Sequence, residues 1–264
     1  MQLTIRARLD YVFPHPTDLL LQLEAAANID EQRVDRAHIA VPDCEHFVRI
    51  AGHDGIGDRI WIRTRKRLTV DYTASLTILR QLAEIERLAM VPPHLLPGET
   101  VQYLLDSLYC PASRFQNFVE AEFGGLAGGA RIAAMRDWIE HSFRYSPGSS
   151  DSTTTALDSF VARQGVCRDY AHVLITLARA SAIPARFASV YAPDVRPQDF
   201  HAVAEVFLAD GLGGGVWHLI DPTGMAAAGA MAKIGIGRDA ADVSFMTVFG
   251  TTTMVEQAVD VQQT

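Results

Sequence analysis

The stretch RQGVCRDYAHVL, residues 163–174, joins a turn that contains glycine to a run with helical periodicity, and it places Cys167 at the start of that run. The first turn of a helix carries unpaired backbone N–H groups and the positive end of the helix dipole, which favour an anion. A thiol in such a position ionises more readily than a free cysteine does. Free cysteines are also among the most buried residue types, so position alone leaves both a packing role and a reactive role open.

The sequence around this stretch predicts helices followed by strands. Apolar residues recur at helical spacing in RIAAMRDWIEHSF (131–143), and TTTALDSFVARQG (153–165) opens with threonine cap candidates and ends in a glycine. The helix that starts at Cys167 has to end before Pro184, because the residue ahead of a proline is disfavoured in the α conformation. Three strand patterns come next, at residues 185–191, 201–209 and 216–222. This order of elements predicts an α+β domain.

The chain up to about residue 80 has a different pattern, in which apolar and polar residues alternate with period two and turn residues such as HDGIGD interrupt the runs. The runs are LTIRARLDYVF, QRVDRAHIAV, HFVRIAG and DRIWIRTRKRLTVDYTASL. Such a pattern predicts an antiparallel sheet, arranged as a sandwich or small barrel. The segment MVPPHLLPGETV (90–101) contains three prolines and reads as a linker. We therefore expect an antiparallel β-sandwich-like domain over residues 1–95 and a second domain over residues 96–264.

Composition narrows the class of protein. The chain has 264 residues, is 48% hydrophobic, and carries 23 Lys and Arg against 31 Asp and Glu, for a net charge of −8. This balance argues against nucleic acid or an anionic membrane as the main partner. The basic run RTRKR (63–67) lies in an alternating stretch, which favours a solvated strand face over a phosphate site. No apolar run is long enough to span a membrane and no cleavable leader is visible, so we expect a cytoplasmic protein.

The cysteines fit the same expectation. Cys44, Cys110 and Cys167 are few and far apart, unlike a disulfide framework or a CxxC metal site. The group His38, Cys44 and His46 in HIAVPDCEH matches no common zinc spacing. The sequence therefore predicts a reducing compartment and neither a metal nor a cofactor.

A base and a carboxylate can be sought on the last two predicted strands. If residues 201–209 and 216–222 form a hairpin whose tip is the glycine-rich DGLGG, its centre lies near residue 211 or 212. Both centres place His201 and Asp221 on one face of the sheet, and a centre at 211 makes them direct cross-strand neighbours with Cβ atoms roughly 4.5–5.5 Å apart. Asp221 could then accept the ring N–H of His201 and leave the other nitrogen to face a thiol.

The motifs that would indicate a serine hydrolase, a zinc protease or a P-loop nucleotide-binding protein are missing from the sequence. The sequence has no GxSxG elbow, HExxH pair or phosphate-binding GxxxxGK[ST] loop. The remaining histidines are expected to be surface or structural residues, and these are His15, His38, His46, His53, His94, His141, His172 and His218.

At the residues singled out above, the sequence resembles the bacterial transglutaminase-like proteins, which are assigned as cysteine proteases with a papain-like core. The motifs are FRYSPGSSDSTTTALDSFVARQGVCRDYAHVLITLARASAIPARFASVYA, DFHAVAEVFL and WHLIDPTG, within about residues 139–224, and weaker likeness extends on both sides, including a β-rich N-terminal domain. The resemblance implies that Cys167 is the nucleophile, His201 the base and Asp221 the group that orients it. Val203 departs from the family, which has an aromatic residue there. Glu205 and Trp217 match the family and read as core or supporting residues.

The resemblance and the spacing together predict thiol-dependent acyl transfer or amide hydrolysis on a peptide or protein amide substrate. With water as the acceptor the enzyme would be a peptidase or amidase, and with an amine it would be a transglutaminase. A peptide-binding module that keeps the fold without catalysis is the remaining alternative. The sequence leaves the oligomeric state open.

Overall fold

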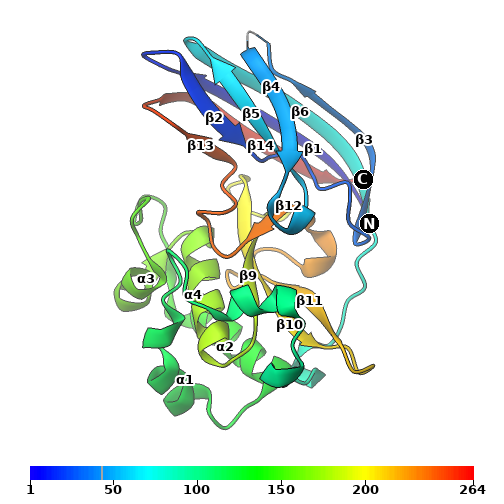
Figure 1. The fold of residues 1–264 in the computed structure, drawn as a ribbon, viewed down its shortest axis with the longest axis vertical. Coiled ribbons are helices and arrows are strands. Elements are labelled where there is room, and N and C mark those ends of the chain that lie inside the picture. Colours follow the sequence, from blue (N-terminus) through cyan, green and yellow to red (C-terminus); the bar gives the residue numbers. More distant parts are fainter. Residues whose placement is uncertain (43) are drawn as a thin grey trace.

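A computed structural model describes residues 1–42 and 44–264, and it divides into two lobes (Figure 1). A β-sandwich forms one lobe, and helices packed against a separate sheet form the other. In the described part of the chain, every helix is either too short or too polar to cross a bilayer.

The sandwich consists of two antiparallel sheets. The first has the order β14-β1-β6-β3, with β14 (Thr253–Gln263), β1 (Gln2–Val12), β6 (Arg67–Ile78) and β3 (Gln32–Ala40). The second has the order β13-β2-β5-β4, with β13 (Met246–Val248), β2 (Thr17–Leu21), β5 (Asp58–Thr64) and β4 (Cys44–Ala51). In β1 the buried side chains are every second residue from Leu3 to Leu9, so the alternation seen in the sequence is the inward face of the sandwich. The predicted sandwich is confirmed.

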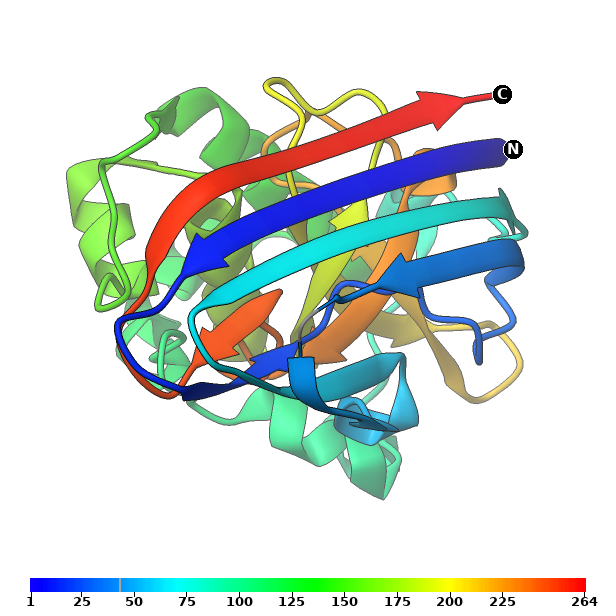
Figure 2. The ribbon, with the colours of Figure 1, turned by 90° about the horizontal axis from the view of Figure 1, so that it is seen from above.

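The C-terminal strands belong to this lobe. Strand β14 pairs with β1 along nearly its whole length, and the two chain ends lie side by side (Figure 2). Strand β13 pairs with β2, and Val259 and Val261 of β14 are buried in the sandwich core. The predicted second domain includes residues 246–263, whereas their strand pairing and burial place them with the first lobe. Pairing across the full length of the chain leaves no local sequence signal.

The second lobe is built on the antiparallel sheet β11-β10-β9-β12. Its strands are β9 (Ala185–Tyr191), β10 (His201–Ala209), β11 (Gly215–Ile220) and β12 (Ala232–Gly237). Its helices are α1 (Gln116–Phe123), α2 (Gly128–Ser142), α3 (Ala156–Ala162) and α4 (Cys167–Ala180), and a short parallel pair joins β7 (Arg144–Tyr145) to β8 (Gln164–Gly165). Helix α4 packs on β9 and β10 (Figure 1). The predicted α+β class is confirmed.

A buried ionic cluster connects the two lobes. The carboxylate of Glu205 in β10 accepts a hydrogen bond from Arg186 Nε at 2.7 Å and lies 2.5 Å from Lys233 Nζ. Lys233 also donates to Glu31, at the entrance to sandwich strand β3, at 3.0 Å. Burial alone would raise the pKa of Glu205, but Arg186 and Lys233 outweigh this effect and lower the pKa to about 2. Glu205 is therefore an ionised core residue.

Candidate active site

Helix α4 begins at Cys167 because a buried carboxylate caps it. Asp169 accepts hydrogen bonds from the backbone N–H of Val166 at 2.8 Å and from the Ser150 hydroxyl at 2.6 Å. Its side chain is fully buried, and Arg168 donates to its other oxygen at 2.9 Å. A Cβ at Gly165 would lie only 2.5 Å from Asp169 Cβ, so the glycine of the GVC motif is what allows this close approach. These contacts fix the first turn, and with it the thiol.

His201 and Asp221 meet as a buried pair. The distance from His201 Nε2 to Asp221 Oδ2 is 2.9 Å, and their side chains are 0% and 2% exposed. Ala204 pairs with Ile220, so the hairpin is centred on residue 212. When this register is continued past the end of β11, Asp221 lies opposite Val203. The prediction that Asp221 and His201 are direct cross-strand neighbours is therefore wrong. The prediction that both lie on one face of the sheet is right. Asp221 reaches the ring diagonally.

Several donors anchor the carboxylate of Asp221. Thr223 donates to Oδ1 through its backbone N–H at 2.8 Å and its hydroxyl at 2.7 Å, and the backbone N–H of Ala226 donates to Oδ2 at 2.9 Å. Burial raises the pKa of Asp221, but the hydrogen bond and charge of His201, with the Thr223 contacts, lower it overall. Asp221 is thus ionised and held in place.

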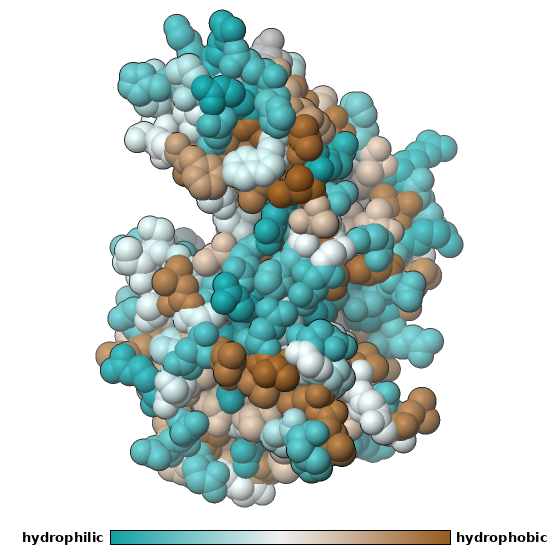
Figure 3. Space-filling view, viewed as in Figure 1, coloured by the Kyte–Doolittle hydropathy of each residue, from teal (hydrophilic) through white to brown (hydrophobic). Residues whose placement is uncertain are grey.

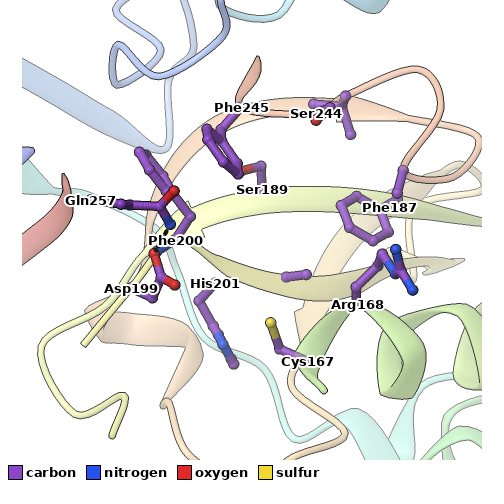
Figure 4. A pocket seen from close by; sticks show the side chains of 13 residues that line it. Cys167, Arg168, Phe187, Ser189, Asp199, Phe200, His201, Ser244, Phe245 and Gln257 are labelled. Atoms are coloured by element: carbon purple, nitrogen blue, oxygen red, sulfur yellow. Dashed lines mark hydrogen bonds between the residues drawn. The ribbon is translucent and has the colours of Figure 1, made fainter. Parts of the chain in front are cut away.

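The second nitrogen of His201 faces the thiol. Nδ1 is buried and has no hydrogen-bond partner among the described residues, and Figure 4 shows the ring beside Cys167. Burial lowers the pKa of His201, but Asp221 and the Cys167 side chain outweigh burial and raise it to about 10. The imidazole is therefore a cation at neutral pH and lies next to the sulfur of Cys167.

Tyr145 lies next to the Cys167 thiol, and no pattern in the sequence indicates a role for it. The parallel pairing of Tyr145 with Gly165 brings it to the start of α4. Its pKa is raised well above the ordinary value, first by burial and then by the charge of Cys167, while the Cys167 backbone N–H acts in the opposite sense. Tyr145 is therefore a neighbour of Cys167. A two-residue parallel strand gives no periodicity by which to find it.

A cavity of about 250 Å³ opens at Cys167 and His201. Both lobes line it: Phe187, Ser189 and Phe200 come from the second lobe, and Gln257 comes from β14 (Figure 4). The space-filling view shows an indentation between the lobes on one side of the molecule (Figure 3). Val203, where the sequence departs from the family pattern, is fully buried in the apolar cluster around Tyr103 and does not line this cavity.

The other two cysteines, and the His/Cys group considered as a metal site in the sequence, lie away from the Cys167 cavity. Cys110 is buried in the core, and burial raises the pKa of its thiol to about 12. Cys44 lies in β4 and His38 in β3, which belong to different sheets of the sandwich. Within residues 1–42 and 44–264, no three potential ligating side chains come together.

His172, expected to be structural, is fully buried in the core. Its ring stacks on Tyr109 with 5.1 Å between centroids, and Nε2 accepts a hydrogen bond from the backbone N–H of Ala240 at 3.1 Å. Burial, followed by the charge of Arg168, lowers the pKa of His172 from 6.5 to about 3. The folded protein therefore holds this imidazole neutral.

We expect His172 to make the fold sensitive to acid. Between pH 6.5 and pH 3 the unfolded chain binds a proton that the folded chain excludes, so stability falls as the pH drops through this window. The loss is about 3 kcal/mol between pH 7 and pH 4. Urea unfolding of the wild type and His172→Gln at several pH values measures it as the difference between the two proteins. A difference that stays constant from pH 7 to pH 4 would contradict the assignment.

The chain is similar to known proteins in sequence and in fold. Residues 119–222 match the family model described as the transglutaminase-like superfamily. The fold is similar to that of a Cytophaga hutchinsonii protein called a "Putative Cysteine Protease", with 28% identity, a TM-score of 0.90, and coverage of 99% of this chain and 90% of that one. An uncharacterized Mycobacterium leprae protein is 30% identical over 120 residues, which is 44% of this chain but only 42% of that relative's length.

A more distant likeness is to the periplasmic domain of TgpA from Pseudomonas aeruginosa. It has 17% identity and a TM-score of 0.42, over 84% of this chain and 87% of that one.

Proposed function

We propose that this chain, whose residues 119–222 match the transglutaminase-like superfamily, is a thiol-dependent acyl-transfer enzyme that hydrolyses peptide or isopeptide amide bonds. One observation carries the proposal: the buried hydrogen bond between His201 and Asp221 leaves His201 Nδ1 without another partner among the described residues, beside Cys167. A nucleophile, a base and a group that orients the base are the parts that such catalysis needs.

In the proposed reaction the Cys167 thiolate attacks the amide carbonyl, and a carbon–sulfur bond forms. The carbon–nitrogen bond then breaks as His201 gives its proton to the leaving amine, which leaves a thioester on Cys167. Neutral His201 next takes a proton from water, the resulting hydroxide attacks the thioester, and the acid is released. The thiolate and the imidazolium are thereby restored.

The oxyanion that forms during attack needs hydrogen-bond donors. The backbone N–H of Cys167 at the start of α4 is one candidate donor, and the hydroxyl of Tyr145, which the pairing of β7 with β8 brings to the start of the same helix, is a second. Donors of this kind contribute about 3–4 kcal/mol each where they have been measured. With an amine in place of water the same thioester would give transamidation.

A panel of peptides and isopeptides, incubated with the wild type and with Cys167→Ala, tests the proposal. We expect the wild type to release the amine product and to show an acyl adduct on Cys167 by mass spectrometry, and Cys167→Ala to show neither. Added primary amine separates transfer from hydrolysis through the ratio of products. Binding of the same peptides by both proteins without cleavage would favour the peptide-binding module instead.

The three cysteines also support a proposed cytoplasmic location, because all three are free. Fractionation of cells that express the full native chain would test this, and recovery outside the cytoplasm would contradict it.

A further inference from the structure

The cavity beside Cys167 contains a carboxylate that the proposed reaction does not use. Asp199 lies two residues ahead of His201 and lines the cavity (Figure 4). Its Oδ1 accepts hydrogen bonds from the backbone N–H of Phe200 and from Gln257 Nε2, both at 2.8 Å. Its Oδ2 has no partner among residues 1–42 and 44–264 and remains open to a ligand.

The sandwich lobe holds this carboxylate in its orientation. Gln257 in β14 donates to Asp199 and accepts a hydrogen bond from the hydroxyl of Tyr11 in β1 at 2.8 Å. Two side chains of the sandwich, Tyr11 and Gln257, therefore hold the carboxylate of Asp199 on a loop of the other lobe through consecutive hydrogen bonds. This contact also gives the C-terminal strand a role at the cavity.

Among residues 1–42 and 44–264, no cationic side chain forms an ion pair with Asp199, and the cation of His201 is paired with Asp221. Arg168 also lines the space, but its guanidinium donates to Asp169 at 2.9 Å and to the backbone carbonyl of Asp151 at 2.7 Å. Beside Asp199, the ring of Phe200 stacks on Phe245 with 4.7 Å between centroids, which gives an apolar wall next to the anion. A carboxylate next to aromatic rings suits an alkyl chain that ends in an ammonium group.

The position of Asp199 indicates which part of the substrate it meets. His201 delivers a proton to the leaving amine, so the amine half of the substrate lies on the His201 side of Cys167. Asp199 is on that side, and Arg168 is on the other side of the thiol (Figure 4). His201 itself lines the same cavity.

From this arrangement, which rests on the proposed function, we infer that Asp199 forms a subsite for a cationic group on the amine half of the substrate. The class is an amide whose amine component carries a second positive charge, such as a lysine residue or a diamine. The same subsite would select diamines as acceptors if the thioester reacts with an amine.

Methanethiosulfonate reagents test the subsite without a known substrate, because they modify any accessible thiol. The aminoethyl, ethyl and sulfonatoethyl reagents carry a positive, neutral and negative head, and mass spectrometry gives the rate at Cys167 for each. Asp199→Asn keeps the oxygen that accepts from Phe200 and Gln257 and removes the charge. We expect this change to lower the ratio of the aminoethyl rate to the ethyl rate by about threefold to tenfold. The control is Asp194→Asn, an exposed aspartate of the same loop that does not line the cavity.

An equal ratio in the wild type and in Asp199→Asn would overturn the inference, as would an equal fall in Asp194→Asn. A second measurement uses peptides with lysine or norleucine directly after the scissile bond. The wild type should turn over the lysine peptide faster than the norleucine peptide, and the ratio of these two rates should fall toward one in Asp199→Asn. Equal turnover of both peptides by the wild type refutes the subsite and leaves the proposed function standing. A reagent ratio that depends on Asp199, without any turnover, supports the subsite and refutes the function.

Discussion

Replacing His201 with alanine is expected to lower kcat/KM for amide hydrolysis by roughly 10³- to 10⁴-fold, because the ring both stabilises the thiolate and protonates the leaving amine. The buried pairing with Asp221 and the raised pKa of His201 are the physical basis of this expectation. Among the described residues, no other histidine lines the cavity that contains Cys167. No other imidazole can therefore take over the role of His201 without a rearrangement of the fold.

The same variant has a readout that needs no substrate. At pH 6 an isolated thiol is almost entirely protonated, so the rate of iodoacetamide alkylation at Cys167 reports its pairing with the imidazolium. We expect this rate to exceed that of Cys44 and Cys110 in the wild type, and to fall at least tenfold in His201→Ala. The buried thiol of Cys110 and the partly buried thiol of Cys44 are internal controls in both proteins. An unchanged rate at Cys167 would show that the ring does not activate the sulfur.

The sequence carries most of the information that positions the candidate site. The GVC motif predicts a helix that starts at Cys167, and α4 starts there because Asp169, only two residues later, caps it. The hairpin is equally local, so its centre could be bracketed to within one residue from the glycine-rich tip. Only the choice between the two centres was open, and the observed register brings Asp221 to His201 along a diagonal.

Contacts between distant segments could not be predicted in this way. Strand β14 pairs with β1 across nearly the whole chain, and Tyr145 reaches Cys167 through a pairing with Gly165 that spans two residues. Neither pairing produces a periodic pattern in a short stretch of sequence, because each depends on which strand edges the rest of the fold leaves unpaired. The consecutive hydrogen bonds that link Tyr11, Gln257 and Asp199 have the same origin, since they exist only once β14 has joined the sandwich.

Glu205 is the residue whose loss should cost the fold most. We expect Glu205→Ala to lower the free energy of unfolding by about 3–5 kcal/mol, because it leaves two buried cations, Arg186 and Lys233, without their shared anion. Arg186 would retain its position 4.0 Å from the Trp217 ring, and Lys233 its contact with Glu31, but neither replaces a fully buried carboxylate. Urea unfolding measures the loss.

A second variant separates the unpaired charge from the simple loss of packing. In Glu205→Ala/Lys233→Met one of the stranded cations is also removed, so part of the lost stability should return even though the cavity left by the glutamate remains. Alkylation of Cys167 should proceed at the wild-type rate in both variants at temperatures where they are folded, because Glu205 supports the sheet and does not touch the sulfur. A cost below 1 kcal/mol for Glu205→Ala, or a double variant less stable than the single one, would contradict an essential role for this carboxylate in balancing the buried charges that join the lobes.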